Sequence, residues 1–311
     1  MNSLLNNKHT NLWGAIVPGE NAEKVKGMLL VAVSAASYGL IPVFAKTAYA
    51  AGTDTYTLLF LRFLAATPLM FLLLFLRKVP LPSLREILVL LGLGAGGYGA
   101  QAFFYLMALN YASTAVVIFI IFTYPALVMI GSALFFREKV TLPKVIALSL
   151  ALAGAFLIIE GEWEASSTGI ILALLAAVVY TAYLLVSSRV VKAGRVLPSS
   201  AFLMLGSLFF YGFIDLCTGF RPPTRLNGLV AIAMLALIST VLAFWSFFAG
   251  LQKTGPSTAA LVATLEPVVA VLSSVLILAE PLTARTVLGG TLVLAALVVT
   301  ALPWQETQGA G

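Results

Sequence analysis

The chain has 311 residues, of which 61% are hydrophobic and only 10% are charged, and its mean hydropathy is +1.04. A soluble domain carries about 25% charged residues, so this composition leaves too little polar material to coat a water-facing surface. Cys217 is the single cysteine and His9 the single histidine, which excludes an intramolecular disulfide and a Cys/His metal site. The net charge of +6 would suggest nucleic acid in a soluble protein, but in a membrane protein its position among the loops decides its meaning.

Ten apolar blocks, most of them near the ~20 residues needed to cross a bilayer core, follow one another along the chain. The first block is too long for a signal peptide, so we expect it to remain as a helix behind a polar tail, 1–26. A short tail, 304–311, closes the chain. The sequence predicts an all-α integral membrane protein with helices at 27–46, 55–76, 84–108, 113–136, 143–160, 168–190, 198–218, 227–250, 257–279 and 283–303.

The distribution of lysine and arginine predicts the orientation. With the N-terminus inside, the inner segments hold thirteen of these residues and the outer segments four, Arg62 being left out because it lies within a helix. Cytoplasmic loops carry the excess of positive charge. Both termini are therefore expected in the cytoplasm.

The two halves of the chain repeat each other in one constant register, without a gap from the first helix to the fifth. Leu on Leu is expected by chance in two apolar stretches, whereas proline on proline and glutamate on glutamate in one register is not. Since each half, 27–160 and 168–303, holds five helices, the second half enters the membrane from the opposite side. Such inverted repeats suit alternating access around a site near the midplane. The matches include Gly27 with Gly169, Tyr38 with Tyr180, Pro125 with Pro267, Glu138 with Glu280 and Thr141 with Thr283.

Two stretches carry a resemblance to a known family. The first runs through 108–115, Pro125 and 137–141, and the second through 251–260, 266–267 and 279–283. Both resemble EamA-type units, which characterise the drug/metabolite transporter superfamily, and together the units span about 27–303. The resemblance implies ten helices, both termini inside, and export of metabolites, commonly amino acids. Overall similarity points toward the YddG-type exporters of aromatic and other amino acids.

Ionisable residues inside a membrane span are functional candidates, because burying them in hydrocarbon is costly. Glu266 lies near the middle of the ninth helix, beside Pro267, which frees the carbonyl of Ala263. This carboxyl could bind a substrate ammonium or a proton, or be a structural group. Arg62, in the second helix, could attract a substrate carboxylate, but we favour a packing role. Asp215, near the outer end of the seventh helix, is expected to be interfacial.

Uncharged polar and aromatic residues at mid-helix depth predict a cavity drawn from the third, fourth, eighth and ninth helices. Tyrosine, tryptophan and a few amide or hydroxyl groups suit an apolar amino-acid side chain. Taken singly, each aromatic residue also fits helix packing or an interfacial belt. The predicted substrate-binding residues, besides Glu266, are Tyr38, Tyr98, Gln101, Tyr124, Tyr180, Ser239, Thr240, Trp245 and Ser246.

Glycines and prolines mark candidate hinges. The third helix holds Gly92, Gly94, Gly96, Gly97 and Gly99, and Gly92 with Gly96 forms a GxxxG pair that favours close packing. Gly96, Gly97 and Gly99 are also candidates for a hinge that moves during transport. Mid-helix prolines are kink candidates, with the repeat-equivalent pair Pro125 and Pro267 ahead of Pro42 and Pro68. Glu138 and Glu280, which end the fourth and ninth helices, are expected to be structural and to bond the start of the following helix.

Several catalytic and energy-coupling signatures are absent from the sequence. It shows no Walker A pattern, GxSxG or HExxH motif, so we expect no ATP-binding partner, no cofactor, no metal and no enzymatic activity. The sequence predicts a secondary exporter of amino acids, aromatic or neutral ones favoured, or of similar zwitterions. Glu266 or the freed carbonyls would take the ammonium, and backbone donors, tyrosines or Gln101 the carboxylate.

Other functions and several properties stay open. A nucleotide-sugar or phosphate-ester antiporter would need several basic groups in the cavity, and only Arg62 lies within a helix. A lipid scramblase or membrane enzyme is the less favoured alternative, since no polar groove or reactive dyad shows in the sequence. Uniport and proton coupling through Glu266 both fit, and the oligomeric state is open. Short loops and a basic face fit a bacterial inner membrane, with a small molecule and the bilayer as partners.

Overall fold

The computed structural model describes residues 19–108, 111–112, 114–159, 165–192, 194–278 and 282–302. Within them the regular secondary structure is helical, apart from an isolated bridge between Ala112 and Ala165. Residues 1–18, the predicted tail 304–311 and Glu280 lie outside the described residues. The predicted polar tail 1–26 is too long, because α1 begins at Gly19 and so includes its last eight residues. The elements are α1 (Gly19–Gly39), α2 (Ile41–Ala50), α3 (Thr55–Leu76), α4 (Leu84–Gly92), η2 (Leu93–Gly99), α5 (Ala100–Ala108), α6 (Thr114–Ile121), α7 (Tyr124–Phe136), α8 (Leu142–Ile158), α9 (Ser167–Val190), α10 (Val196–Thr218), α11 (Leu226–Ala236), η3 (Leu237–Leu242), α12 (Ala243–Thr254), α13 (Pro256–Ala263), α14 (Glu266–Leu278) and α15 (Ala284–Ala301).

These elements assemble into the predicted membrane spans. In the described part of the chain, nine helical stretches are long and apolar enough to cross a bilayer, and α8 is a shorter apolar helix. Each lies where the sequence predicts a helix, with ends that differ by a few residues. The fold prediction of an all-helical membrane protein is therefore confirmed.

Polar side chains at the span boundaries explain where several helices begin. Asp54 precedes α3 and accepts a hydrogen bond from the Thr57 amide at 2.8 Å. Ser83 and Glu86 form a reciprocal capping box at the start of α4. Thr283 caps α15. Each cap satisfies backbone donors that a helix start otherwise leaves without a partner.

Several spans are interrupted or wound differently, and two of these irregularities repeat between the halves. A turn at 122–123 separates α6 from α7, and a turn at 264–265 separates α13 from α14, so the two breaks are equivalent in the register of the repeat. The π-helical segments η2 and η3 lie in the third and eighth spans, which are also repeat partners. The first span breaks at Leu40, next to Pro42, whereas α3 continues unbroken through Pro68.

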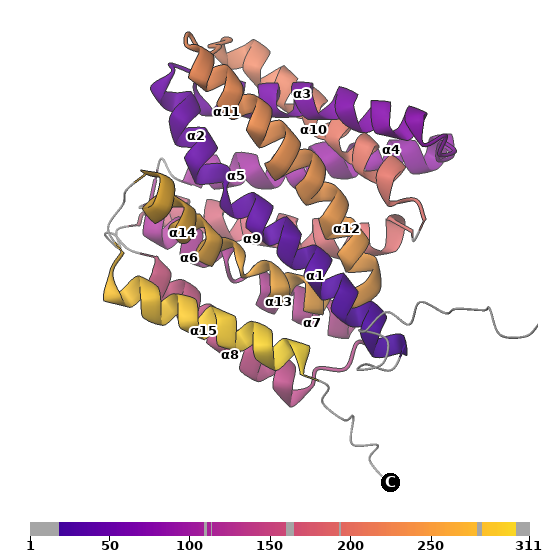
Figure 1. Cartoon of the computed structure of the whole chain (residues 1–311), viewed down its shortest axis with the longest axis vertical. Helices are drawn as coiled ribbons and strands as arrows, with labels where there is room; N and C mark the ends of the chain where they lie inside the picture. The colour runs from indigo at the N-terminus through magenta and orange to yellow at the C-terminus, as the bar shows by residue number, and fades with distance from the viewer. Residues whose placement is uncertain are drawn as a thin grey trace, which may run out of the picture.

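The spans form three layers (Figure 1). α3, α4 and α10 lie on one side, α1, α9, α12, α13 and α7 fill the middle, and α8 with α15 lie on the other side. α8 and α15, which are repeat partners, cross closely: a Cβ added to Gly154 would lie 2.6 Å from the Gly289 carbonyl oxygen, and the reverse distance is the same. A glycine at each position lets the two backbones approach.

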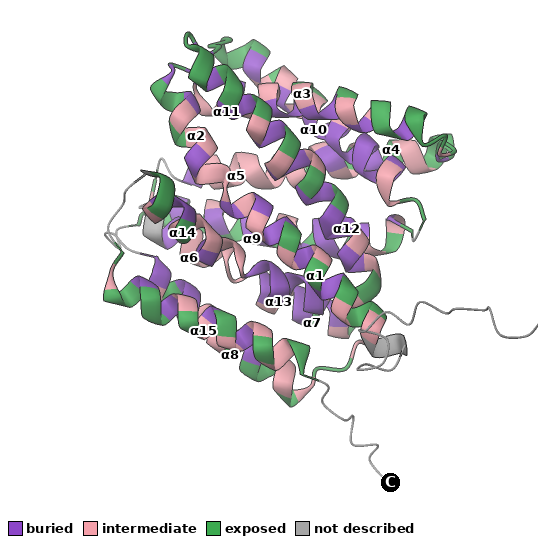
Figure 2. Ribbon diagram, viewed as in Figure 1, coloured by how far each residue is buried: buried purple, intermediate pink, exposed green. Residues whose placement is uncertain are grey.

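Burial follows the layers (Figure 2). In the middle layer, α12 and α13 are buried over most of their length, while the outer faces of α3, α4, α11 and α15 are exposed. Many of the exposed side chains are large and apolar, such as Leu72, Phe75, Leu134 and Leu276. In water such a surface would aggregate, so it is the surface that faces lipid.

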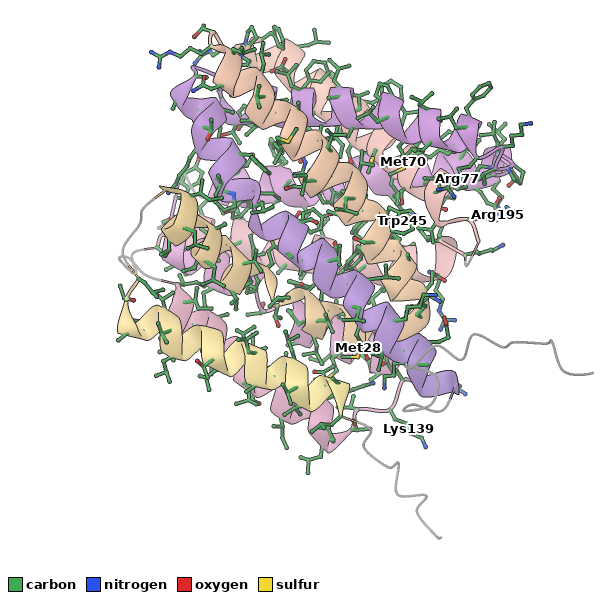
Figure 3. All side chains as sticks on the ribbon, viewed as in Figure 1. Met28, Met70, Arg77, Lys139, Arg195 and Trp245 are labelled. Carbon is green, nitrogen blue, oxygen red and sulfur yellow. The ribbon has the colours of Figure 1, made fainter. Side chains whose placement is uncertain are left out.

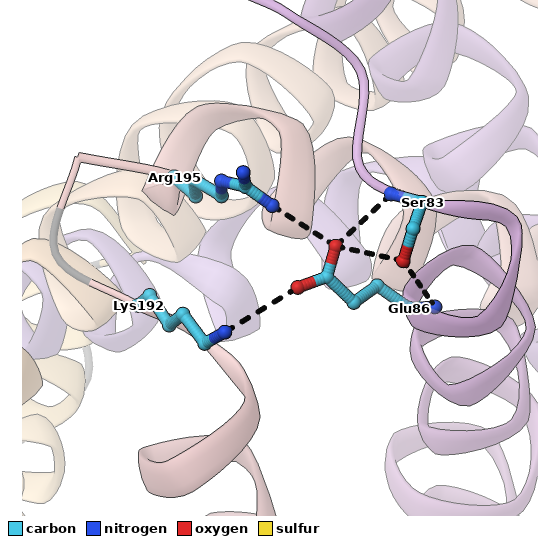
Figure 4. A network of polar contacts seen from close by, with 4 residues as sticks. All are labelled: Ser83, Glu86, Lys192 and Arg195. Carbon is cyan, nitrogen blue, oxygen red and sulfur yellow. Dashed lines mark hydrogen bonds and ion pairs between the residues drawn. The ribbon is translucent and has the colours of Figure 1, made fainter.

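One end of the bundle, called the basic face here, holds the turns after α3, α7, α9 and α12. α1 begins and α15 ends at this face (Figure 1). Polar bridges join the elements here. Figure 4 shows Glu86 of α4 holding Arg195 at 2.9 Å and Lys192 at 3.5 Å, across the α9–α10 turn. Under the positive-inside rule the basic face is expected to be cytoplasmic.

Candidate functional site

A continuous cluster of aromatic rings fills the centre of the bundle. Tyr124 at the start of α7 meets Tyr180 of α9 edge to face, with 4.9 Å between ring centroids. Tyr180 stacks near Tyr183, and Tyr183 contacts Tyr98 of η2 at 6.1 Å. Tyr98 also contacts Phe244 of α12, and Phe244 contacts Tyr38 of α1. Four of the predicted tyrosines are therefore brought together from four different spans.

Four tyrosine hydroxyls of this cluster are free of hydrogen bonds to the described residues. Tyr38, Tyr98 and Tyr180 are half-buried rather than fully enclosed. The hydroxyls of these three and of Tyr124 make no hydrogen bond with any residue that the structure describes. Since a buried hydroxyl needs a partner, these four hydroxyls are available to bind water or a ligand.

Arg62 lies beside the cluster and is 3% exposed. Its Nε donates to Thr240 Oγ1 at 2.6 Å and one terminal nitrogen donates to the Ser239 carbonyl oxygen at 2.5 Å. The guanidinium also lies 6.0 Å from the ring centroid of Tyr38. Through these contacts Arg62 joins α3 to η3, in line with the packing role that we favour. A guanidinium has five N–H donors, however, so these two hydrogen bonds leave N–H groups of Arg62 that can bind another acceptor.

Glu266 is the first residue of α14, at the break near the middle of the ninth span. It is half-buried, and it forms neither a hydrogen bond nor an ion pair with the described residues. Its carboxyl is within electrostatic range of Arg62 and of the hydroxyls of Tyr38, Tyr124 and Tyr180. An accessible carboxyl without a protein partner is unusual at this depth of a membrane protein.

The helix breaks predicted from Pro125 and Pro267 are present, and they position the site. Tyr124 and Glu266, which are repeat partners, are each the first residue of the second half of a broken span. Proline is tolerated there because the first helical amides have no intrahelical acceptor. The hydroxyls of Thr123 and Thr264 each donate a hydrogen bond, 2.6 Å long, to a backbone carbonyl oxygen at the breaks.

The two broken spans pack differently on the two sides of their breaks. On the basic-face side, α7 packs against α13. On the far side, α6 packs against α9, and α14 packs against α1 and α2. The two broken spans thus contact each other on the basic-face side, where Glu138 accepts hydrogen bonds from Lys144 at 2.7 Å and from Ser257 at 2.8 Å.

The glycines of η2 serve packing, but not in the predicted pair. A Cβ on Gly92 or Gly96 would meet nothing within 4 Å, so the expected close packing of this GxxxG pair is wrong. The close approach is instead made by Gly94, whose added Cβ would lie 2.1 Å from the Leu203 carbonyl oxygen. A Cβ added to Gly97 or Gly99 would lie 2.7 or 2.8 Å from the ring of Tyr183 or Phe210, so these two glycines leave room for aromatic rings of neighbouring spans. Their predicted role as hinges stays a prediction.

Other predicted residues lie elsewhere. Trp245 is 42% exposed and lines a groove at the edge of the bundle rather than the tyrosine cluster. Ser246 bonds carbonyls of its own helix, and Gln101 is half-buried without a described hydrogen-bond partner. Asp215, expected at the interface, is only 4% exposed and accepts a hydrogen bond from Thr57 at 2.7 Å.

The structure adds aromatic residues to the cluster that the sequence analysis did not select. Phe63, Tyr183, Tyr211 and Phe244 pack between the predicted tyrosines. A signal existed for one of them, because Tyr183 follows Tyr180 by three residues and so shares its helix face. The other three carry no such signal, because the residues that they contact lie far away in the sequence.

Comparison with known families decides the class of protein. A model of the EamA-like transporter family matches residues 25–160 and again residues 167–302. The two matches are related by the internal repeat. The offset that places Gly27 on Gly169 also places the first and last residues of the first match on those of the second. The chain belongs to the EamA-like transporter family. This confirms the superfamily that the sequence resembles and the double, inverted arrangement.

Relatives of this EamA-like transporter are themselves described only as transporters. An uncharacterized transporter of Archaeoglobus fulgidus is 32% identical over 211 residues, which cover 67% of this chain and 75% of the relative. The Bacillus subtilis transporter YcbK is 23% identical over 280 residues, covering 86% of this chain and 90% of YcbK. A solved structure with 18% identity covers 88% of this chain and 96% of its own, with a TM-score of 0.78, and bears out the fold.

Proposed function

We propose that this EamA-like transporter is a secondary exporter of amino acids, aromatic and neutral ones favoured, or of similar small zwitterions. The observation that carries the proposal is the half-buried, unpartnered carboxyl of Glu266, set in a cluster of tyrosines within electrostatic range of Arg62. A carboxylate and a guanidinium in one aromatic site match the two charges and the apolar side chain of such a substrate.

Each group has a role in this proposal. Glu266 takes the substrate ammonium, together with carbonyls near the breaks at Pro125 and Pro267. The N–H groups of Arg62 that do not hold η3, with tyrosine hydroxyls or Gln101, take the carboxylate. The rings of Tyr98, Tyr124 and Tyr180 cover the substrate side chain, since aromatic faces give large contact area at a fixed geometry.

The packing of the broken spans supports an alternating-access mechanism. The contacts of α7 with α13 and the Glu138 bridges hold the basic face together, while the outer halves, α6 and α14, pack on other helices. This arrangement fits a state closed toward the cytoplasm with the site reached from the far side. Rocking of the two inverted halves about the site would open the basic face.

A phosphorylated cargo is less well matched. Of the arginines and lysines in the described part of the chain, Arg62 is the one that lies at the tyrosine cluster, and recognition of a phosphate ester calls for several convergent donors. The non-enzymatic assignment stays a prediction, which membership of a transporter family favours. The bacterial or archaeal plasma membrane is the location that the relatives favour.

Uptake of radiolabelled compounds into proteoliposomes tests the proposal. The panel holds phenylalanine, tryptophan, methionine, leucine, lysine and glutamate, with UDP-glucose as the nucleotide-sugar control, with and without an imposed pH gradient. Saturable uptake of neutral amino acids is expected, and its gradient dependence separates uniport from proton coupling. If the folded protein takes up none of the amino acids, the substrate assignment is wrong.

A further inference from the structure

A cavity lies apart from the tyrosine cluster, at the basic-face end of the bundle. It is a groove of about 860 Å³ between α3 and the start of α10 on one side and η3 with α12 on the other. Met70 and Leu73 line the α3 side, and Leu237, Val241 and Trp245 line the α12 side. Figure 3 shows Met70, Trp245 and Arg77 gathered at this end of the molecule.

The groove opens toward the membrane. Most of its lining residues belong to spans, and several are large, apolar and partly exposed: Leu73 is 39%, Leu237 44% and Trp245 42% exposed. From Leu237 to Lys253 the α12 wall is about 24 Å long at 1.5 Å per residue. Half of a bilayer core is only ~15 Å thick, so an acyl chain of one leaflet fits along this wall.

The mouth of the groove is basic. Arg77 and Lys253 line it on opposite walls. Lys253 forms an ion pair with Glu23, and nearby Arg195 is held by Glu86. Arg77 is exposed, and its guanidinium has neither a hydrogen-bond nor an ion-pair partner among the described residues. A cation at the lipid headgroup level without a protein counter-ion attracts an anionic group.

We propose that this groove binds an anionic phospholipid, with one acyl chain against Trp245 and Val241 and the headgroup phosphate on Arg77 and Lys253. The apolar wall and the basic mouth each match one part of such a lipid. A zwitterionic lipid has the same acyl chains but no net negative charge to bind the basic residues at the mouth of the groove. The lipid would fill the space between α12 and α3, the two helices that Arg62 and η3 join.

Trp245 provides a direct probe of the groove. The other tryptophans, Trp13, Trp163 and Trp304, are replaced by phenylalanine, which leaves a single fluorophore in the groove wall. This variant is reconstituted in vesicles that hold equal mole fractions of either phosphatidylglycerol or phosphatidylcholine with brominated acyl chains. Bromine quenches tryptophan on contact, so the quenching reports which lipid occupies the groove.

Stronger quenching by the brominated phosphatidylglycerol is expected, and Arg77→Gln should reduce this preference about fivefold, the effect of one surface charge near anionic lipid. Arg77→Lys should retain it. Lys139→Gln is the matched control, because Lys139 lies at the same face but away from the groove (Figure 3). Equal quenching of the unsubstituted single-tryptophan protein by both lipids would overturn the proposal, even if a variant failed to fold. So would a preference that Arg77→Gln leaves unchanged, or quenching by neither lipid.

Discussion

Replacement of Arg62 by glutamine would separate its structural contacts from its proposed contact with substrate. Hydrogen bonds from a charged donor contribute about 1.5–3 kcal/mol each, so losing both would lower the free energy of unfolding by about 3–6 kcal/mol. Thr240 keeps a bond from its hydroxyl to the Leu235 carbonyl oxygen at 2.9 Å, which places the expected loss near the lower end. A thermal or chemical denaturation series of the purified protein measures this loss.

The same substitution should remove the preference for a carboxylate in the substrate. Removing one partner of a buried charge pair costs about 2 kcal/mol or more, which is a factor of about 30 in Kd. We expect the native protein to bind phenylalanine at least that much more tightly than phenethylamine, which lacks the carboxylate. Arg62→Gln should bind the two with similar affinity in scintillation proximity or calorimetric assays.

Thr240→Val is the matched control. It removes one of the two bonds that Arg62 donates at the η3 segment but keeps the guanidinium, so stability should fall by about 1 kcal/mol while the preference for phenylalanine remains. If folded Arg62→Gln still prefers phenylalanine, Arg62 is only a packing residue and the substrate carboxylate binds elsewhere. If stability does not fall at all, the bonds to η3 do not stabilise the native state as reasoned.

Three further predictions test the site and the packing around it. Glu266→Gln, which keeps the size but removes the charge, should lower amino-acid uptake at least about tenfold and remove any dependence on a pH gradient; unchanged uptake and pH profile would exclude Glu266 from both roles. Gly94→Ala should lower the free energy of unfolding by about 1–3 kcal/mol because its Cβ would meet the Leu203 carbonyl, whereas Gly96→Ala should be neutral or slightly stabilising; equal melting temperatures for the two variants would contradict the packing described for η2. Glu138→Ala removes a partly exposed bridge, so hydrogen exchange at the first turns of α8 and α13 should speed up about tenfold, and rates like those of the native protein would show that the bridge does not hold the basic face together.

Much of the fold follows from local sequence features. The positions of the spans follow from apolar runs near the thickness of a bilayer, and Pro125 and Pro267 mark the two equivalent breaks, because proline removes a backbone donor. Proline alone does not decide a break, since α3 continues through Pro68. The single register of the internal repeat predicts the inverted halves, since five helices in each half reverse the direction of entry. Glu266 is identifiable for the same reason as the spans, as an ionisable group in an otherwise apolar run.

Tertiary structure decides which of these residues meet. Trp245 and Tyr98 both lie inside predicted helices and are both amphipathic aromatic residues, but only Tyr98 faces the central cluster, because the rotation of a span about its axis depends on its neighbours. Glycines show the same limit: Gly94 and Gly96 are near neighbours in the sequence, yet only Gly94 meets another helix. The basic groove likewise brings together Arg77 and Lys253, which belong to opposite halves of the repeat. Composition and spacing therefore determine which segments cross the membrane, whereas the face that each segment turns to its neighbours is fixed only when all the spans pack together.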